Sequence, residues 1–96
     1  MAKYLTRVEL HGAQHGDHAY DVLHTAMGVK GFSRMIVGDQ GNVYRLPTAE
    51  YQIETGLTTR QVNDTALAAA NSTRLKSSVI TVQYVEAAWT PDMLIS

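Results

Sequence analysis

The chain has no cysteine among its 96 residues. This absence excludes disulfide frameworks, thiolate nucleophiles and thiolate metal sites, so that histidine, aspartate and glutamate remain as metal ligands. Without disulfides, stability has to come from burial, and a chain of this length can bury one hydrophobic core. We therefore expect a single domain over residues 1–96.

Long apolar runs are missing as well. No stretch approaches the roughly 20 apolar residues that a membrane-spanning helix requires, and the opening residues, MAKYLTRVEL, have no apolar core of signal-peptide length. We expect a cytoplasmic protein with no membrane insertion.

Neither sign of charge dominates, since eight Lys and Arg stand against nine Asp and Glu. No overall field attracts phosphates, so nucleic-acid binding would need a local basic patch. The residues available for one are Lys30, Arg34 and Arg45 around the middle of the chain, with Arg74 and Lys76 later. Scattered charges of this kind also fit an ordinary solvated surface.

Hydrophobic periodicity predicts the first elements. Residues 3–11 alternate as a half-buried strand, with Tyr4, Thr6, Val8 and Leu10 on one face. Residues 17–28 have apolar positions at helical spacing, and Asp17 is the expected N-cap. The run FSRMIV predicts a strand over residues 32–37, and GDQGN after it predicts a hairpin connection.

The second half predicts three further elements. The returning strand begins at Val43, is interrupted by Pro47, and continues over residues 50–57 with Tyr51 and Ile53 on one face. Thr58 or Thr59 caps a helix over residues 59–72. Residues 77–85 form the last strand, in which Ile80, Val82 and Tyr84 alternate with Thr81 and Gln83.

This β-α-β-β-α-β order predicts an α+β, ferredoxin-like fold, with two helices on one face of a four-stranded antiparallel sheet. The other face is open. It is expected to be polar at the central strands, which present Arg7 and Glu9 beside Glu50, Gln52 and Glu54. An RNA-recognition motif is disfavoured, because that class exposes aromatic residues on this face.

The C-terminal tail, residues 87–96, is rich in large apolar side chains: Trp89, Met93, Leu94 and Ile95. Such residues are expected to pack either on their own domain or on a second copy of it. We favour a homodimer in which the tail or the last strand contributes to the interface.

The stretch FSRMIVGDQGNVYRLPTAEYQIETGLTTRQVND resembles the GhoS-type antitoxin endoribonucleases of bacterial toxin-antitoxin systems. Residues at matching spacings are Phe32, Ser33, Gly41, Leu46, Tyr51, Ile53, Thr55, Leu57 and Asp64, and Met27 sits at the matching end of the first helix. The resemblance implies a ferredoxin-like antitoxin that cuts the messenger RNA of a small membrane-active toxin. The family is similar in structure to Cas2 nucleases, which dimerise and carry an aspartate at the end of the first strand. Here that position is His11, and His24 occupies a helix position where the family has arginine.

Three of the four histidines lie in HGAQHGDH, residues 11–18. His15 and His18, with Asp17 and Asp21, offer a mixed ligand set, but the spacing matches no specific zinc pattern, so we predict no metal and no other cofactor.

Metal-independent RNA cleavage needs an acid, a base and a cation. His11 and His24 are the candidate catalytic pair, because the pKa of histidine lies near neutrality. Arg7, Arg34 and Arg45 are the candidate cations, and together with Lys30 they are the candidate RNA-binding residues. The alternative is a solvated loop that ends in a helix cap.

Two hypotheses about function follow. The first is an antitoxin-like RNA-targeting protein that acts as an endoribonuclease. The second is a non-catalytic homodimeric protein-interaction module, which the near-neutral charge, the polar open face and the apolar tail favour. A phage or mobile-element protein that binds a host component would fit this second class.

Overall fold

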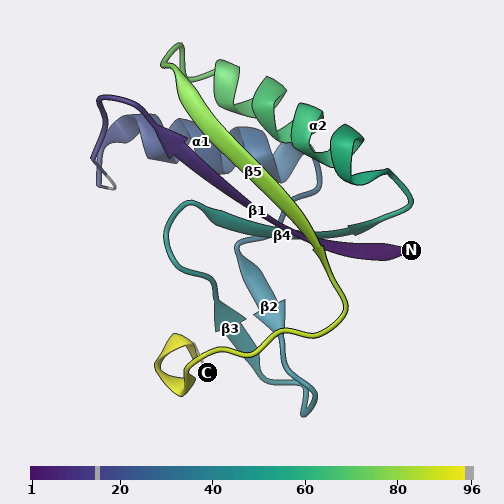
Figure 1. Cartoon of the computed structure of the whole chain (residues 1–96). Helices are drawn as coiled ribbons and strands as arrows, with labels where there is room; N and C mark the ends of the chain where they lie inside the picture. Colours follow the sequence, from purple (N-terminus) through teal and green to yellow (C-terminus); the bar gives the residue numbers. More distant parts are fainter. Residues whose placement is uncertain (15, 95–96) are drawn as a thin grey trace.

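The computed structural model describes residues 1–14 and 16–94. Its elements are β1 (Ala2–Leu10), α1 (His18–Val29), β2 (Met35–Val37), β3 (Val43–Arg45), β4 (Glu50–Thr55), α2 (Thr59–Asn71), β5 (Ser77–Tyr84) and the 3₁₀ turn η1 (Pro91–Met93). Both helices lie on one side of β1, β4 and β5, and the β2–β3 hairpin projects from the opposite end of the molecule beside the C-terminal tail (Figure 1). The α+β class predicted from the sequence is confirmed.

Strand β1 is the centre of a three-stranded antiparallel sheet in the order β4-β1-β5. Its alternate residues Tyr4, Thr6, Val8 and Leu10 are buried at 3%, 1%, 0% and 2% exposure. Tyr4, Val8 and Leu10 form one hydrophobic core with buried residues of both helices and with Tyr51 of β4. The predicted division of β1 into a core face and an open face is therefore confirmed.

The two helices begin differently. Thr58 and Gln61 form a complete capping box at the start of α2, in which each side chain accepts a hydrogen bond from the other residue's backbone N–H. Asp17 is the N-cap of α1, as predicted, but its side chain makes no cap hydrogen bond. The carboxylate instead accepts a hydrogen bond from the backbone N–H of Gln14, which holds the preceding loop.

The predicted four-stranded sheet is divided into sheets of three and two antiparallel strands. Ser33 pairs with Gln52 of β4 through two backbone hydrogen bonds of 2.8 Å, but β2 then pairs with β3. The short connection through Gly41, at φ +84°, brings β3 directly back against β2. The predicted return strand is also two strands, because Pro47 lacks an N–H and Ala49 has a left-handed φ of 69°.

Strand β5 places its apolar residues on the open face. Its register partners on β1 are Arg7 for Ile80 and Leu5 for Val82, and residues opposite each other share a face. Ile80 is 62% exposed and Val82 48% exposed. On β1 and β4 the expected polar residues Arg7, Glu9, Glu50, Gln52 and Glu54 do lie on this face, whereas the edge strand β5 adds apolar residues to it.

Candidate functional site

His24 and Tyr51 form a polar contact between α1 and the sheet. The Nδ1 atom of His24 lies 2.7 Å from the hydroxyl of Tyr51, a residue 27 positions later in the chain. Tyr51 is 1% exposed, whereas His24 is half-buried and keeps contact with solvent. The Tyr20 and Phe32 rings pack beside this pair, at centroid distances of 6.5 Å from His24 and from Tyr51 respectively.

Burial and nearby charges shift the pKa values of both His24 and Tyr51. The pKa of His24 is lowered, first by burial and then by the positive charge of Arg34, while Asp21 acts in the opposite direction. Burial strongly raises the pKa of Tyr51. His24 is therefore neutral near neutral pH, and Tyr51 keeps its proton. A neutral imidazole of this kind is able to accept a proton at physiological pH.

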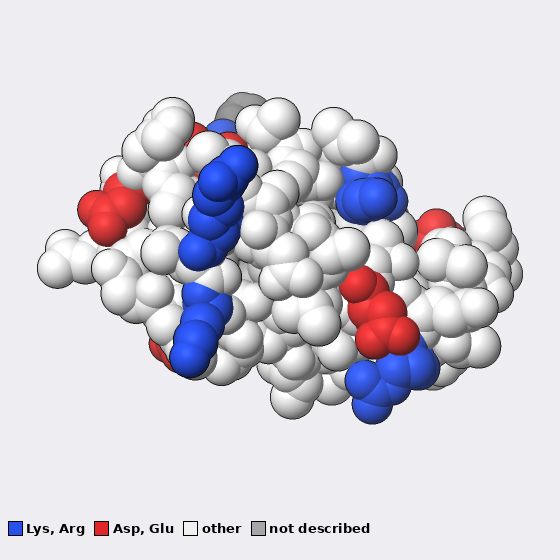
Figure 2. All heavy atoms as spheres, turned by 90° about the horizontal axis from the view of Figure 1, so that it is seen from above, with Lys and Arg blue, Asp and Glu red and all other residues white. Residues whose placement is uncertain are grey.

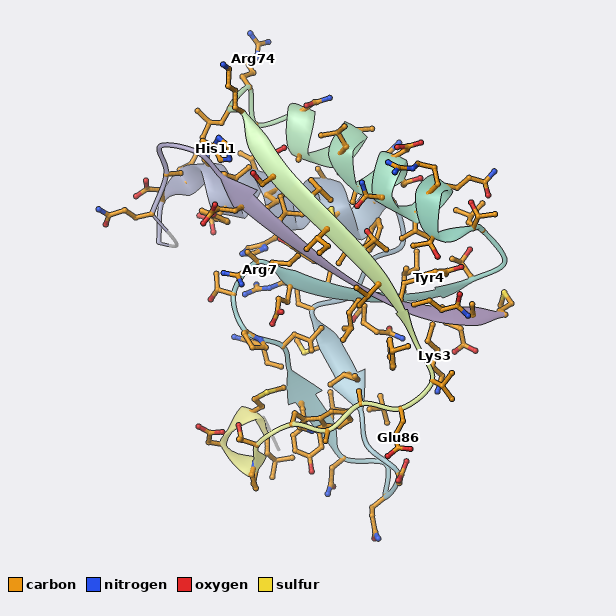
Figure 3. All side chains as sticks on the ribbon, viewed as in Figure 1. Lys3, Tyr4, Arg7, His11, Arg74 and Glu86 are labelled. Atoms are coloured by element: carbon orange, nitrogen blue, oxygen red, sulfur yellow. The ribbon has the colours of Figure 1, made fainter. Side chains whose placement is uncertain are left out.

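His11 lies on the other face of the sheet from His24. Its Nε2 atom is 2.8 Å from the hydroxyl of Ser78, which is opposite Glu9 on the open face. Figure 3 shows His11 at the end of β1, near the turn that carries Arg74. The three-stranded sheet separates the two predicted catalytic histidines, because Tyr51, the partner of His24, belongs to the core on the helix side. The structure does not bring His11 and His24 together as an acid and base pair.

The predicted RNA-binding residues are distributed over the molecule. Arg7 is exposed on the open face opposite Glu50, and Lys30 is the exposed C-cap of α1. Arg34 and Arg45 are brought near each other by the hairpin, in which Met35 pairs with Arg45. The surface seen from above in Figure 2 is mostly uncharged, with a few basic and acidic side chains spread over it. Of these residues, Arg34 is the one whose positive charge lowers the pKa of His24.

The open face of the three-stranded sheet is a second candidate site. We call its apolar residues on β1 and β5 the open-face patch: Leu5, Ile80, Val82 and Tyr84. Arg7 and Glu9 lie beside the patch and line a shallow hollow with Ser78 and Ile80. The alternation along β5 in the sequence is enough to place Ile80, Val82 and Tyr84 on one face of the strand. The pairing with β1 is needed to show that this face is the exposed one.

Two of the predicted interface residues of the tail, Trp89 and Leu94, contact the chain's own hairpin. The ring of Trp89 packs edge-on against Tyr44 of β3 at a centroid distance of 5.3 Å, and Leu94 forms a β-bridge with Tyr44. Trp89 and Met93 are half-buried, while Leu94 is 46% exposed. Ile95 lies outside the described residues. Of the two alternatives for the tail, packing on its own domain is observed for Trp89.

Residues 1–14 and 16–94 contain no group of three acidic or histidine side chains arranged to hold a metal ion. His15, part of the alternative metal ligand set, lies outside the described residues. Within the same residues, no helix has both the length and the apolar character to cross a membrane.

No protein-family model matches the chain, and no curated protein sequence matches it significantly.

Proposed function

We propose that this chain is a non-catalytic interaction module that functions as a homodimer. The open-face patch is the observation that carries the proposal. Ile80 and Val82 are neighbours on that face and are 62% and 48% exposed, although they are β-branched residues that normally pack in sheets. Burying them against a second chain is favoured at about 25 cal/mol per Å² of apolar surface removed from water.

The surroundings of the patch fit a protein interface. Arg7 and Glu9 flank it, which gives the polar rim that such interfaces usually have around an apolar centre. Tyr84 also adds an aromatic side chain, and its hydroxyl accepts a hydrogen bond from Gln52 at 3.2 Å. Aromatic residues are enriched among those that contribute most to binding.

Size-exclusion chromatography with light scattering tests the homodimer. The protein should elute with twice the chain mass of 10.6 kDa. A monomer at every concentration measured would overturn the proposal.

Deletion of residues 89–96 separates the two possible interfaces. We expect the shortened chain to remain a dimer if the open-face patch forms the contact, since Trp89 packs on Tyr44 of its own chain. Conversion to a monomer with retained circular dichroism would assign the contact to Trp89, Met93, Leu94 and Ile95 instead.

RNA targeting is the second candidate function, and the cluster of His24, Tyr51 and Arg34 favours it. In this proposal the neutral His24 takes the proton of a ribose 2′-hydroxyl, whose oxygen attacks the adjacent phosphorus and displaces the 5′-oxygen. Arg34 stabilises the charge that develops on the phosphoryl oxygens. Because His11 is on the opposite face, water supplies the proton that the departing oxygen requires. The resemblance to antitoxin endoribonucleases suggests a toxin messenger RNA as the substrate.

Cleavage of a toxin-type messenger RNA in EDTA tests this candidate. His24→Ala should abolish the cleavage, whereas His18→Ala, at the exposed start of α1, should retain it. His11→Ala should also remain active, because His11 lies across the sheet. Equal cleavage by the wild type and His24→Ala would exclude His24 from the mechanism.

We also propose that the strands have a ferredoxin-like order. The two hydrogen bonds between Ser33 and Gln52 place the segment before β2 next to β4. Continuing the sheet in this direction gives the order β2-β4-β1-β5, in which the first and third strands of the ferredoxin-like unit are central.

A further inference from the structure

Strand β5 forms an edge of the three-stranded sheet, since in the described part of the chain its strand partner is β1. Edge strands in natural proteins usually carry charges, proline or a bulge that prevents pairing with other chains. The sequence of β5, SSVITVQY, has no charged residue and no proline. The opposite edge strand, β4, has Glu50 and Glu54 and is partly covered by Ser33. Only one of the two edges is therefore protected in the usual way.

The hydrogen bonds of β1 show which backbone groups of β5 face outward. The N–H of Val8 donates to Ala49 on the β4 side, whereas the N–H of His11 donates to Lys76 on the β5 side. In an antiparallel sheet, successive residues direct their backbone groups to opposite neighbours. Odd-numbered residues of β1 therefore bond to even-numbered residues of β5. The residues that direct N–H and C=O away from the sheet are Ser77, Val79, Thr81 and Gln83.

Space is available along this edge. A hollow of about 400 Å³ lies between the start of α2 and the middle of β5, lined by residues that include Arg60, Asn63 and Val79. Leu67 lies one turn after Asn63 on the same side of α2 and is 39% exposed. An added strand would meet open backbone groups and an apolar side chain on the helix.

We propose that β5 pairs with β5 of a second copy in antiparallel orientation, with the two-fold axis at Ile80. This inference rests on the proposed homodimer and specifies its interface. In this register Val79 opposes Thr81 of the second copy and Ser77 opposes Gln83, so all the outward-facing residues gain hydrogen-bond partners. The result is a continuous six-stranded sheet. Two copies of an uncharged strand meet without electrostatic repulsion.

The side chains of the open face are self-complementary in this register. Ile80 meets Ile80 of the second copy across the axis, and the small Ser78 lies opposite Val82, so the second copy covers the side of Ile80 and Val82 that faces the β5 edge. Lys76 lies opposite Tyr84, where its ammonium group is able to interact with the aromatic ring. A closed, isologous dimer of this type leaves no further β5 edge exposed.

Single cysteines test the register directly, since the natural chain contains none. In a non-hydrogen-bonded antiparallel pair the Cα atoms are about 4.5 Å apart, within the range that a disulfide spans. Oxidation of Ile80→Cys should therefore give a covalent dimer on a non-reducing gel. Val82→Cys is the matched control on the same face, and it should cross-link much more slowly because it lies opposite Ser78. Faster cross-linking of Val82→Cys than of Ile80→Cys would overturn the proposed register.

Amide hydrogen exchange of the wild-type protein tests edge pairing without a substitution. The N–H groups of Val79, Thr81 and Gln83 should exchange as slowly as those of Ile80 and Val82, and dilution to monomer should make only the first set fast. Rapid exchange of the outward groups in a protein that is a dimer by light scattering would overturn β5 pairing and leave the homodimer intact. A protein that is monomeric throughout would overturn both.

A lysine introduced on each edge strand of the sheet gives an independent measurement. Ile80→Lys should convert the dimer to a monomer, because it places two ammonium groups together at the axis. Glu54→Lys, at an exposed position on β4, should leave the dimer unchanged. A dimer of Ile80→Lys as stable as the wild type would contradict the proposal.

Discussion

Alternate residues of the same strands form the two faces of the three-stranded sheet, and the two faces are used differently. On β1, Val8 and Leu10 are covered by the helices and are 0% and 2% exposed, whereas Leu5 on the opposite face is only half-buried. The helix side carries the fold, because it contains most of the buried core. The open side has apolar residues that the described chain leaves partly exposed. We therefore expect substitutions on the helix side to change mainly the stability of the fold. Substitutions on the open side should change mainly the association of two copies.

The largest expected effect is on the stability contributed by the helix side. Leu10→Ala should lower the free energy of unfolding by about 2–5 kcal/mol, because it removes buried methyl groups and leaves a cavity. Leu5→Ala is the same substitution on the same strand, and it should cost about half as much or less, since Leu5 is only half-buried. Urea unfolding at a fixed protein concentration measures both values. Equal losses would contradict the division of the sheet into a core face and an interaction face.

Two tyrosines allow the same comparison for hydrogen bonds. Tyr51→Phe removes the hydroxyl that lies 2.7 Å from His24, and it should cost about 0.5–1.5 kcal/mol. Tyr84→Phe removes a 3.2 Å hydrogen bond from Gln52 on the open face, where water replaces the lost partner, so the cost should be within about 0.5 kcal/mol. Thermal unfolding of the two variants checks the order. A larger loss for Tyr84→Phe would reverse the comparison.

The sequence was sufficient for the elements whose pattern is local. The alternation of β1 and the periodicity of α1 and α2 identify their buried faces, and Thr58 is one of the two residues that the sequence offered as the cap of α2. The sequence predicted one four-stranded sheet, whereas the structure has sheets of three and two strands. The prediction failed because β2 could pair with either β3 or β4. Local turn geometry around Gly41 favours β3 over β4, and this competition is not visible in hydrophobic periodicity.

The candidate sites were harder to predict than the elements, because they depend on contacts between elements that are far apart in the sequence. On β5 the more apolar set, Ile80 and Val82, lies on the exposed face, so the usual assignment of apolar residues to the core fails. His24 was identified as a candidate, but its contact with Tyr51 joins a helix and a strand 27 residues apart. His11 was grouped with His24 because the pKa of histidine suits an acid and base pair, and because the family resemblance marks both positions. The sheet that separates them becomes apparent only when β1 and α1 are packed.

The smallest expected effect is the pH dependence that His24 adds to the helix side. Its pKa in the folded protein is below the ordinary value of 6.5, mainly because of burial. Above pH 6.5 the imidazole is neutral in both the folded and the unfolded chain, and it has little influence on stability. As the pH falls below 6.5, the unfolded chain binds the proton first, so the free energy of unfolding should decrease until the pH passes the lowered pKa of the folded state. His24→Gln should remove this part of the decrease, whereas His11→Gln on the open face should retain it. Urea unfolding above and below pH 6.5 distinguishes the two variants, and an unchanged slope in His24→Gln would show that burial of this imidazole is not coupled to folding.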